Sequence, residues 1–339
     1  MANHELRTHL TLVELKARMI NEELQQIIDV LHQPLNIIDD LLFTEANLGD
    51  DFAVSQSLYE PQGSEVNYNQ GAPITVGQAK QEVWKSCIIE DWWQIEEKLA
   101  KRSGNPKKAM FQEETLHVGG LRKRLAQRIF HGTGAGLQIT GLAGLTNYAS
   151  LGTGYVFDNA EGGTPSAESN KTSIWFVKHS PQGFHCFYPK GQEGQELIRR
   201  DYKGLQTMEY TDPEQSDTRL MDVFRGKLGL AFGIAVVHPA AVVRVPNISM
   251  SLWSNSDEYD VNPKVILDAI NYIDAYSEDI PGKLVAYMHS STRARVWRLV
   301  HDLTLTREYD KALEARIYSI NGIPVKCCDQ MSITEAKLT

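Results

Sequence analysis

Residues 60–77 (EPQGSEVNYNQGAPITVG) restrict the possible folds of this chain most, because they can bury little apolar surface against the rest of it. Their large apolar side chains are Val66, Tyr68, Ile74 and Val76. The segments on either side are rich in Val, Tyr, Thr and Gln, a composition that is typical of β-strands. We therefore predict a long hairpin over residues 52–89, whose middle projects from its own body or lies on something else.

The chain after this hairpin is predicted to return to the core and then to form a long helix. Large aromatic side chains favour burial, and bulky residues gather on the return strand: Trp84, Ile88, Ile89, Trp92 and Trp93. Asn105 followed by Pro106 is typical of a helix start, and apolar residues recur at helical spacing as far as Gly132. The helix would have roughly 26 residues and a length of ~39 Å.

Two glycines, Gly119 and Gly120, lie inside this predicted helix. Each costs about 1 kcal/mol relative to alanine in a helix interior. We therefore expect a bend or a close backbone approach there, or two shorter helices in place of one.

The N-terminal segment is predicted to contain an amphipathic helix. Thr11 and Glu14 form a capping box, and apolar residues then recur at helical spacing until Pro34 stops them. Residues 1–11 are polar, so the sequence shows no secretory signal.

The remaining chain reads as a β-rich block followed by an α/β block, and hence as an α+β protein. After a glycine-rich loop (132–163), residues 172–188 are predicted to form two strands joined by a turn at 181–183, and residues 228–248 a buried hairpin around His238. In the last third we expect helices from Asn262 and Ser290 and strands at 284–288 and 323–327.

Composition excludes several classes of protein. With 339 residues, 42% of them hydrophobic and 23% charged, the chain can build a sizeable core and is not mainly disordered. Its net charge of −9 argues against a protein that primarily binds nucleic acid. The longest apolar stretch, 228–243, contains His238 and falls short of the ~20 residues that a membrane helix needs.

We expect the cysteine thiols to be reduced, because none of the four cysteines is in CxxC spacing: Cys87, Cys186, Cys327 and Cys328.

Catalytic and cofactor signatures are weak, and we predict no catalytic, cofactor-binding or metal residue. The run HGTGAGL (131–137) lacks the Lys-Ser/Thr of a phosphate-binding loop and follows a helix. Glu114 and His117 have a spacing that can serve metal ligation, but no second such pair exists. An α/β enzyme with an unrecognised site remains an alternative.

Four blocks of the sequence carry a resemblance to a known family: LTLVELKARM (10–19), KTSIWFVKHSPQGFHCFYPKG (171–191), LGLAFGIAVVHPAAVVRVPNI (228–248) and NGIPVKCCDQM (321–331). Together they resemble the major capsid proteins of short-tailed bacteriophages of the epsilon15 type. The resemblance covers nearly the whole chain.

This resemblance implies the HK97-like phage capsid fold, in which an N-terminal arm, an extended E-loop, a P domain with a long spine helix and an A domain follow one another. We expect the following division: N-terminal arm 1–45, E-loop 46–90, spine helix region of the P domain 91–135, P-domain β block with the glycine-rich loop 136–255, and A domain 256–339.

The implied function is that of a major capsid protein, which self-assembles into pentamers and hexamers of an icosahedral shell around phage double-stranded DNA. The protein would belong to the virion and assemble in the bacterial host cytoplasm. Another virion subunit, such as a connector or tail protein, is an alternative. A shell subunit functions through its interfaces, because its contacts must close around five-fold and six-fold axes.

Candidate functional residues follow from this expectation. The predicted inter-subunit contacts are Val66, Tyr68, Ile74, Leu12 and Leu15. Glycine reaches backbone angles that other residues resist, so the candidate hinges between pentamer and hexamer positions are Gly49, Gly63, Gly71 and Gly77. Basic side chains of the long helix are either solvated or contact DNA on the inner face: Arg122, Lys123, Arg124 and Arg128.

Two departures from relatives bear on the partners. Some capsid proteins of this fold join neighbours through a lysine–asparagine bond whose lysine lies on the E-loop, whereas here no lysine occurs between Lys16 and Lys80. Covalent joining of neighbouring subunits is therefore not expected.

The first capped helix starts at Thr11, so we expect a separate scaffolding protein. The resemblance further implies a cement or decoration protein, a portal and weak nonspecific contact with packaged DNA, and no membrane.

Overall fold

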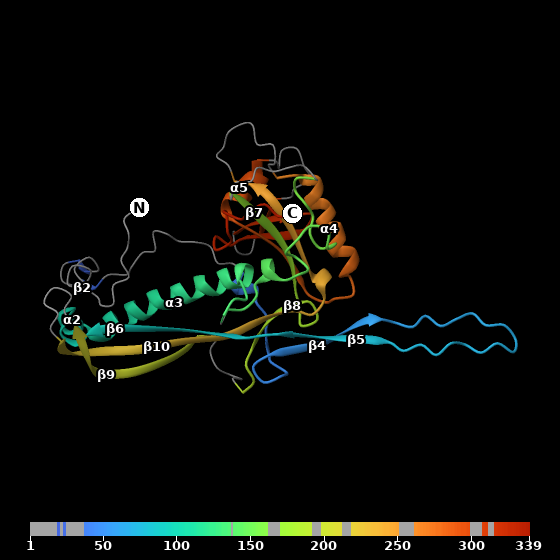
Figure 1. The fold of residues 1–339 in the computed structure, drawn as a ribbon. Coiled ribbons are helices and arrows are strands. Elements are labelled where there is room, and N and C mark those ends of the chain that lie inside the picture. Colours follow the sequence, from blue (N-terminus) through green and yellow to red (C-terminus); the bar gives the residue numbers. More distant parts are fainter. Residues whose placement is uncertain are drawn as a thin grey trace.

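A computed structural model of the chain describes residues 19–20, 23–24, 37–136, 138–161, 170–191, 198–211, 218–250, 261–298, 307–310 and 315–339. Figure 1 shows three parts: a compact body, an elongated layer of strands and a helix on one side of it, and a thin hairpin that extends in the opposite direction. A large mixed sheet joins the body to the elongated layer. None of the described helices is long and apolar enough to cross a bilayer.

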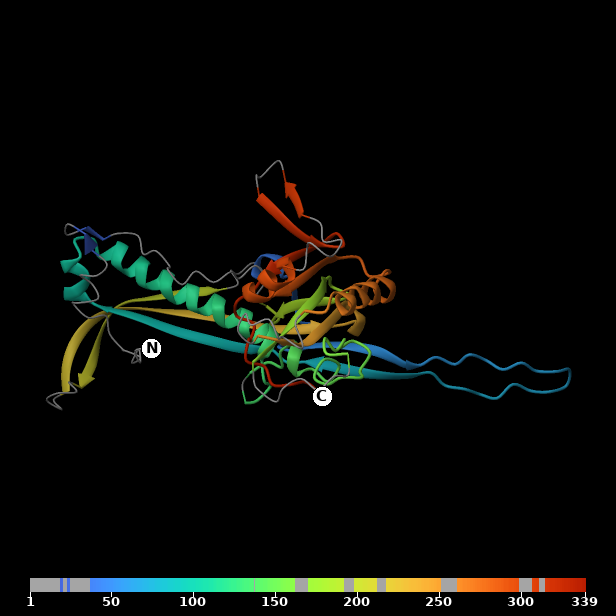
Figure 2. The same cartoon turned by 90° about the horizontal axis from the view of Figure 1, so that it is seen from above.

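The predicted projecting hairpin is confirmed. Strands β4 (Phe52–Tyr59) and β5 (Gln78–Trp84) pair antiparallel, with Phe52 opposite Trp84 at the base. Between the two strands, residues 60–77 form no regular element and reach far beyond the body, as Figures 1 and 2 show from two directions. We call residues 52–84 the projecting hairpin and residues 60–77 its tip.

The elongated layer consists of three strands covered on one face by helices. Strand β10 (Thr218–Val236) lies between β6 (Cys87–Glu96) and β9 (Arg199–Thr211), and both pairings are antiparallel. Helices α2 (Glu97–Arg102) and α3 (Pro106–His131) follow β6, and α3 packs on β6 and β10. Alternate strand residues, among them Trp93 and Leu228, face the helix.

Helix α3 begins and ends where the sequence predicts. The Asn105 side chain accepts a hydrogen bond of 3.1 Å from the Lys108 backbone N–H, and the helix ends at His131. It runs without a break through Gly119 and Gly120, so the alternative of two shorter helices is wrong. A Cβ atom at either glycine would meet nothing within 4 Å, so no described residue approaches the backbone there.

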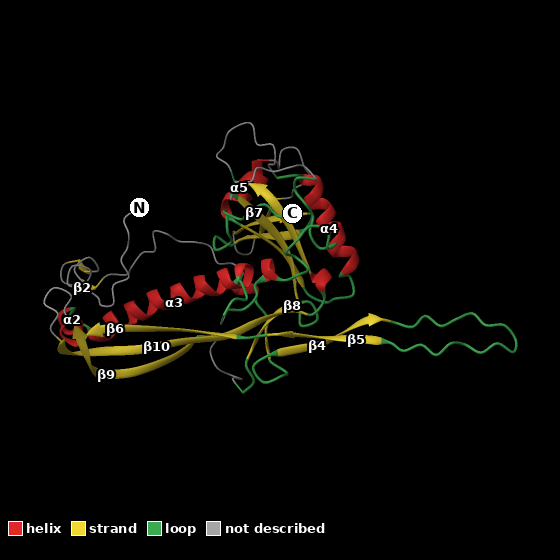
Figure 3. Cartoon of the chain, in the orientation of Figure 1, coloured by secondary structure: helices red, strands yellow, loops and turns green. Residues whose placement is uncertain are grey.

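The body is built on the other strands of the large sheet. Strand β7 (Lys171–His179) lies between β11 (Val242–Ser249) and β12 (Lys283–Met288), and β12 pairs with β15 (Ile323–Cys327). The sheet continues through β14 (Ala315–Ile320) to β13 (Arg307–Asp310), and β8 (Phe184–Tyr188) connects it to β10. Figure 3 shows helices α4 (Pro263–Tyr276) and α5 (Ser290–Arg298) beside these strands.

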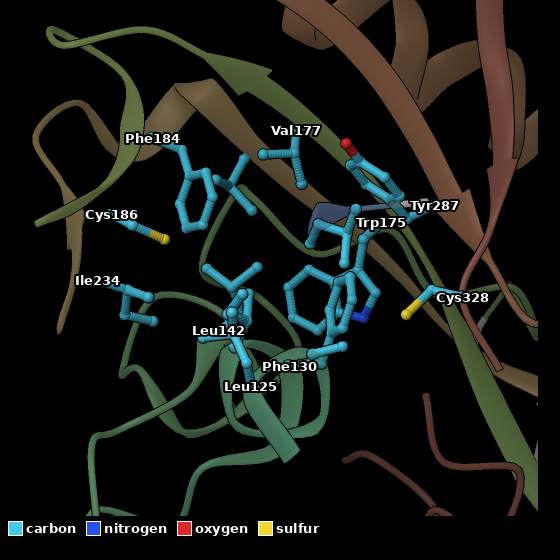
Figure 4. Packing of buried hydrophobic residues seen from close by; sticks show 14 of the residues in the cluster. Leu125, Phe130, Leu142, Trp175, Val177, Phe184, Cys186, Ile234, Tyr287 and Cys328 are labelled. Carbon is cyan, nitrogen blue, oxygen red and sulfur yellow. The ribbon is translucent and has the colours of Figure 1, made fainter. Parts of the chain in front are cut away.

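Two hydrophobic cores lie on opposite faces of the body sheet. Alternation along β7 sends Trp175 and Val177 into one core and Ile174 and Phe176 into the other. Figure 4 shows the first core, where Phe130 at the end of α3 and Leu142 in the short helix η2 (Leu142–Gly144) meet Trp175. The second core is covered by α4 through residues that recur at helical spacing: Val265, Ile266, Ala269, Ile270 and Ile273.

A short segment before β4 fastens the N-terminal side of the chain to the body. Strand β3 (Phe43–Glu45) pairs in parallel with β8, and the helical turn η1 (Ile38–Asp40) precedes it. The Asp40 carboxylate accepts hydrogen bonds of 2.8 Å from Lys283, Lys326 and Tyr287. Burial opposes its ionisation, but these three hydrogen bonds outweigh burial and lower the pKa of Asp40.

Two predictions about local structure are wrong in part. Residues 228–248 form two strands, but β10 and β11 do not pair as a hairpin; the turn η3 (Pro239–Ala241) sends β11 to β7. In the N-terminal segment, β1 (Met19–Ile20) and β2 (Glu23–Leu24) pair where a helix was predicted. By contrast, the two strands predicted in residues 172–188 and the turn between them are confirmed as β7 and β8, which share the pair His179 and Phe184.

Other outcomes concern the remaining elements. The predicted helices at Asn262 and Ser290 and the strands at 284–288 and 323–327 are confirmed as α4, α5, β12 and β15. The β9–β10 pairing was not predicted. Strands on both sides of residue 255 belong to one sheet, since β7 pairs with β12. The division into arm, E-loop, P domain and A domain therefore stays a prediction.

Replacing Gly119 or Gly120 by alanine should raise the free energy of unfolding of the subunit by about 0.5–1 kcal/mol each, because alanine favours a helix and meets free space there. Chemical unfolding of the purified subunit measures this change. Gly226→Ala is the matched control, since its Cβ would overlap the Trp93 ring and should lower stability. Unchanged or lower stability of both helix variants would contradict the prediction.

Candidate functional site

The tip of the projecting hairpin exposes its apolar side chains almost completely. Tyr68 is 98% exposed and Ile74 is 97% exposed, and Val66 and Val76 are also exposed. Large apolar side chains at such exposure are unusual when they gather on one projecting segment. The tip residues therefore have apolar surface that no described part of their own chain covers. The other two candidate contacts, Leu12 and Leu15, lie outside the described residues.

The base of the hairpin, by contrast, is held in place. The Phe52 ring lies 4.9 Å from the His185 ring and 5.6 Å from the Phe187 ring, measured between centroids. Gln56 Nε2 donates a hydrogen bond of 3.1 Å to the Val237 carbonyl. The Asn47 amide and the Ala53 backbone exchange two hydrogen bonds, of 2.7 and 2.8 Å. The hairpin thus leaves the body at a defined place while its tip stays uncovered.

The four candidate hinge glycines differ in backbone conformation. Gly49 and Gly63 have φ values of +66° and +77°, in the left-handed region that favours glycine. Gly49 lies in the turn between Leu48 and Asp51, just before β4. Gly71 and Gly77 do not have positive φ. The role of all four as hinges stays a prediction.

A groove lies at the end of the elongated layer that is far from the hairpin tip. It has a volume of about 340 Å³ and is lined by side chains of α3 and of all three strands, among them Trp93, Met110, Phe111 and Tyr202. The Tyr202 ring stacks on Trp93 with centroids 6.2 Å apart. Gly226 leaves the space that the Trp93 ring fills. Since α2 and the hairpin tip lie at opposite ends in Figure 1, the tip of the same chain does not reach this groove.

The four basic residues of α3 that were named as solvated or DNA-contacting have different environments. Arg122 and Arg124 are exposed, and Lys123 is half-buried. Arg128 donates a hydrogen bond to Gln138, and burial together with the neighbouring Arg124 lowers the pKa of its guanidinium. Contact of these residues with DNA stays a prediction.

His117 and Glu114, whose spacing can serve metal ligation, form ion pairs with other residues. His117 Nδ1 lies 2.7 Å from an Asp91 oxygen and Nε2 lies 3.6 Å from a Glu113 oxygen, so its pKa is raised by these carboxylates against burial. Glu114 lies 3.6 Å from the Arg200 guanidinium. Among the described residues, no cluster of three or more His, Cys, Asp or Glu side chains could hold a metal ion.

This arrangement belongs to a known class of fold. The near-atomic structure of bacteriophage epsilon15 matches the chain with a TM-score of 0.68 and 19% identity over 100% of both chains. The capsid of bacteriophage JBD30 matches with a TM-score of 0.44 and 12% identity, over 89% of this chain and 92% of that one. The SrpI encapsulin of Synechococcus elongatus matches with a TM-score of 0.43 and 11% identity, over 73% of this chain and 99% of that one. The epsilon15 match shows the fold, which is the HK97-like phage capsid fold.

The family of this chain follows from its sequence. The family described as Major capsid protein GP7 matches residues 20–339, and the chain belongs to it. No curated protein matches the sequence significantly. The expectation of a phage major capsid protein with the HK97-like fold is thus confirmed. The protein is a structural component of a phage virion that assembles with copies of itself.

Two buried histidines near the base of the hairpin should make the subunit sensitive to acid. Burial lowers the pKa values of His179 and His185 from 6.5 to about 4. The native state then binds fewer protons than the unfolded state between these pH values. Stability should be fully present above pH 6.5 and fall as pH decreases to about 4, by roughly 2–3 kcal/mol for each histidine.

Unfolding of the subunit in denaturant at a series of pH values measures this dependence. His185→Gln should make the decrease in stability between pH 6.5 and 4 smaller, while His179 still contributes its part. The same pH dependence in His185→Gln and in the original protein would contradict the assignment.

Proposed function

We propose that this capsid subunit assembles into pentamers and hexamers of an icosahedral shell that encloses phage double-stranded DNA. The observation that supports this most is the projecting hairpin, whose tip has exposed apolar side chains that no described part of its own chain covers. A long exposed appendage becomes stable when its apolar side chains and backbone groups gain partners on another molecule. A second copy of the chain is the partner that a self-assembling shell supplies.

The hairpin lies across an adjacent subunit in this proposal. Its tip and the aromatic groove around Trp93 and Tyr202 are at opposite ends of one molecule (Figure 1), so a contact between such ends is heterologous. Heterologous contacts form closed rings when the rotation between copies closes. Val66, Tyr68 and Ile74 are the proposed contact residues of the tip, and Leu12 and Leu15 those of the N-terminal arm.

One sequence must fit both five-fold and six-fold rings. We assign this adjustment to hinges at Gly49, Gly63, Gly71 and Gly77, of which the first two already have left-handed backbone angles. Residues 1–45 act as the arm and 46–90 as the E-loop. The P domain consists of the spine helix region, 91–135, and the β block with the glycine-rich loop, 136–255. The A domain consists of residues 256–339.

Further partners complete the particle. We assign to it a separate scaffolding protein, a portal, a cement or decoration protein, and weak nonspecific contact of DNA with Arg122, Lys123, Arg124 and Arg128. The chain has no enzymatic activity in this proposal, and assembly takes place in the host cytoplasm. Noncovalent contacts of ~1,000 Å² or more, each weighted by ~25 cal/mol per Å² of apolar area, would hold the shell.

Electron microscopy of the purified protein tests the proposed function. Closed particles tens of nanometres across, on the order of a phage head, are the expected product of assembly. Rings of one fixed order would instead indicate a connector or tail subunit, and a monomer that gains thermal stability with a small ligand would indicate an enzyme.

The double variant Tyr68→Ala/Ile74→Ala should raise the concentration needed for shell formation without unfolding the subunit. Both side chains are exposed in the single chain, so its thermal unfolding should not change. Burial of each side chain at the contact contributes about 1.5–3 kcal/mol, so the concentration at which shells form should rise at least about tenfold. Light scattering and electron microscopy measure assembly, with Tyr68→Phe/Ile74→Val as the conservative control. Shell formation by the alanine variant at the original concentration would contradict the contact.

The shell should come apart into single chains under denaturing conditions. The tip of the projecting hairpin contains no lysine that could form a bond with an asparagine of a neighbouring subunit. A denaturing gel of boiled particles should therefore show one band at 38.1 kDa. A ladder of joined subunits would show that covalent links exist.

A further inference from the structure

Residues 331–339 lie across the body and pack on its first core. The backbones of Glu335 and Lys171 exchange two hydrogen bonds, of 2.9 and 3.3 Å, so this segment is joined to β7. Met331 is buried in the first core, and Leu338 packs against it. We call residues 331–339 the strap.

A buried ion pair holds the middle of the strap. Glu335 Oε2 lies 2.9 Å from the Arg244 guanidinium and accepts a hydrogen bond of 2.5 Å from the Ser173 hydroxyl. The guanidinium also donates hydrogen bonds to the Ser173 hydroxyl and to the Tyr148 carbonyl, which fix its position. The other carboxylate oxygen, Glu335 Oε1, is buried and accepts no hydrogen bond from any described residue. A buried acceptor without a donor costs free energy, so a donor that reached this oxygen would be stabilised.

The last residue of α3, His131, faces this oxygen. Its Nε2 atom accepts a hydrogen bond of 3.0 Å from the Ser332 backbone N–H and lies 3.8 Å from Glu335 Oε1. A ring nitrogen accepts a hydrogen bond only when it has no proton of its own. The contact with Ser332 therefore requires a neutral imidazole whose proton is on Nδ1.

The surroundings of His131 favour this neutral ring. Burial opposes its protonation, Arg244 of β11 opposes it as well, and the Glu335 carboxylate of the strap favours it. Burial outweighs the carboxylate, so the pKa of His131 is lowered from 6.5. On α3 itself, the nearest basic side chain, Arg128, donates its hydrogen bond to Gln138.

Protonation of the ring would exchange one contact of the strap for another. A proton on Nε2 would point at the Ser332 N–H, so two donors would face each other and this hydrogen bond would be lost. The new N–H would have the free oxygen of Glu335 as its acceptor, but the present distance of 3.8 Å is too long for a hydrogen bond. The two protonation states therefore favour different positions of residues 332–335.

We propose that His131 is a proton-controlled latch, whose neutral ring holds the strap at the end of α3 and whose protonated ring releases it. This inference concerns the single chain and does not depend on the proposed function. Opening of the strap exposes the ring and restores its ordinary affinity for protons. The open form therefore gains population as the pH falls below 6.5, whereas above pH 6.5 the strap is fully docked.

Nitrogen NMR of the full-length subunit labelled with ¹⁵N-histidine tests the docked state. Above pH 6.5, the His131 ring should have a proton on Nδ1 and none on Nε2. Its signal is identified as the one that the variant His131→Gln lacks. A proton on Nε2 under these conditions would overturn the proposal, because that nitrogen could not then accept a hydrogen bond from Ser332.

Hydrogen–deuterium exchange of the strap amides tests the release. Exchange is expressed as protection relative to an unfolded peptide, which removes the intrinsic effect of pH. From about pH 8 to about pH 5, protection of residues 332–335 should fall by about two- to tenfold, the factor that one hydrogen bond contributes. The β7 amides serve as the internal reference. Constant protection of the strap over this range would overturn the proposal.

His131→Gln separates the latch from general sensitivity to acid. The glutamine carbonyl can accept the Ser332 hydrogen bond at every pH, so protection of the strap should no longer change with pH. His185→Gln is the matched control, because it replaces a buried histidine at the base of the hairpin, and it should keep the fall. The same pH dependence of the strap in His131→Gln and in the original protein would overturn the proposal.

Glu335→Gln supplies a second variant that leaves His131 in place. It removes the charge that favours protonation of the ring, so the fall in protection should move to lower pH. Thermal unfolding checks that both variants fold. If His131→Gln does not fold, the shift in Glu335→Gln and the position of the ring proton in the original protein still decide the question. A fall at the original pH in Glu335→Gln would contradict the latch.

Discussion

Strand β10 is the element on which the rest of the structure depends. Over Val223–Phe232 it pairs with β6, and over Gly233–Val236 it pairs with β8, so one strand belongs to both the elongated layer and the body. Two glycines on this strand, Gly226 and Gly233, leave the space that the rings of Trp93 and Phe187 occupy. The hydrogen-bonded ladder fixes the direction of the elongated layer, with α2 and α3 on it, relative to the body. The packing of Phe52 on Phe187 holds the base of the hairpin on the same sheet.

A frame of this kind explains why the functional surfaces lie at the outside of the molecule. The two cores of the body are buried on both faces of the sheet, and the motifs considered for catalysis serve ion pairs and packing. What the described chain leaves uncovered is the hairpin tip, the aromatic groove at the opposite end and the basic side of α2 and α3. The proposed function assigns a second copy of the chain to the hairpin tip and the aromatic groove, and packaged DNA to the basic residues of α3.

Local signals in the sequence predicted some elements well, while partners in the sheet could not be predicted. The N-cap at Asn105 and the apolar spacing up to Ile129 fixed α3, because capping and periodicity act within a few residues. Residues 60–77 contain few large apolar side chains, and this local composition predicted that the segment projects. Alternation identified the strands in residues 228–248 but gave them the wrong partner, since pairing depends on residues far away in the chain. The β9–β10 pairing was missed because residues 199–211 alternate weakly, and the contacts of tip and hinge residues depend on other molecules.

Hydrogen–deuterium exchange of the backbone amides of residues 60–77, in isolated subunits and in assembled shells, tests the central claim most directly. Exposed amides without regular hydrogen bonds exchange fast, whereas amides covered by a partner are protected. The account predicts fast exchange of the tip in the subunit and strong protection in the shell, while the β7 amides, protected in both, serve as the internal reference. Equally fast exchange of the tip in both states would show that no neighbouring copy covers it, and would contradict the account.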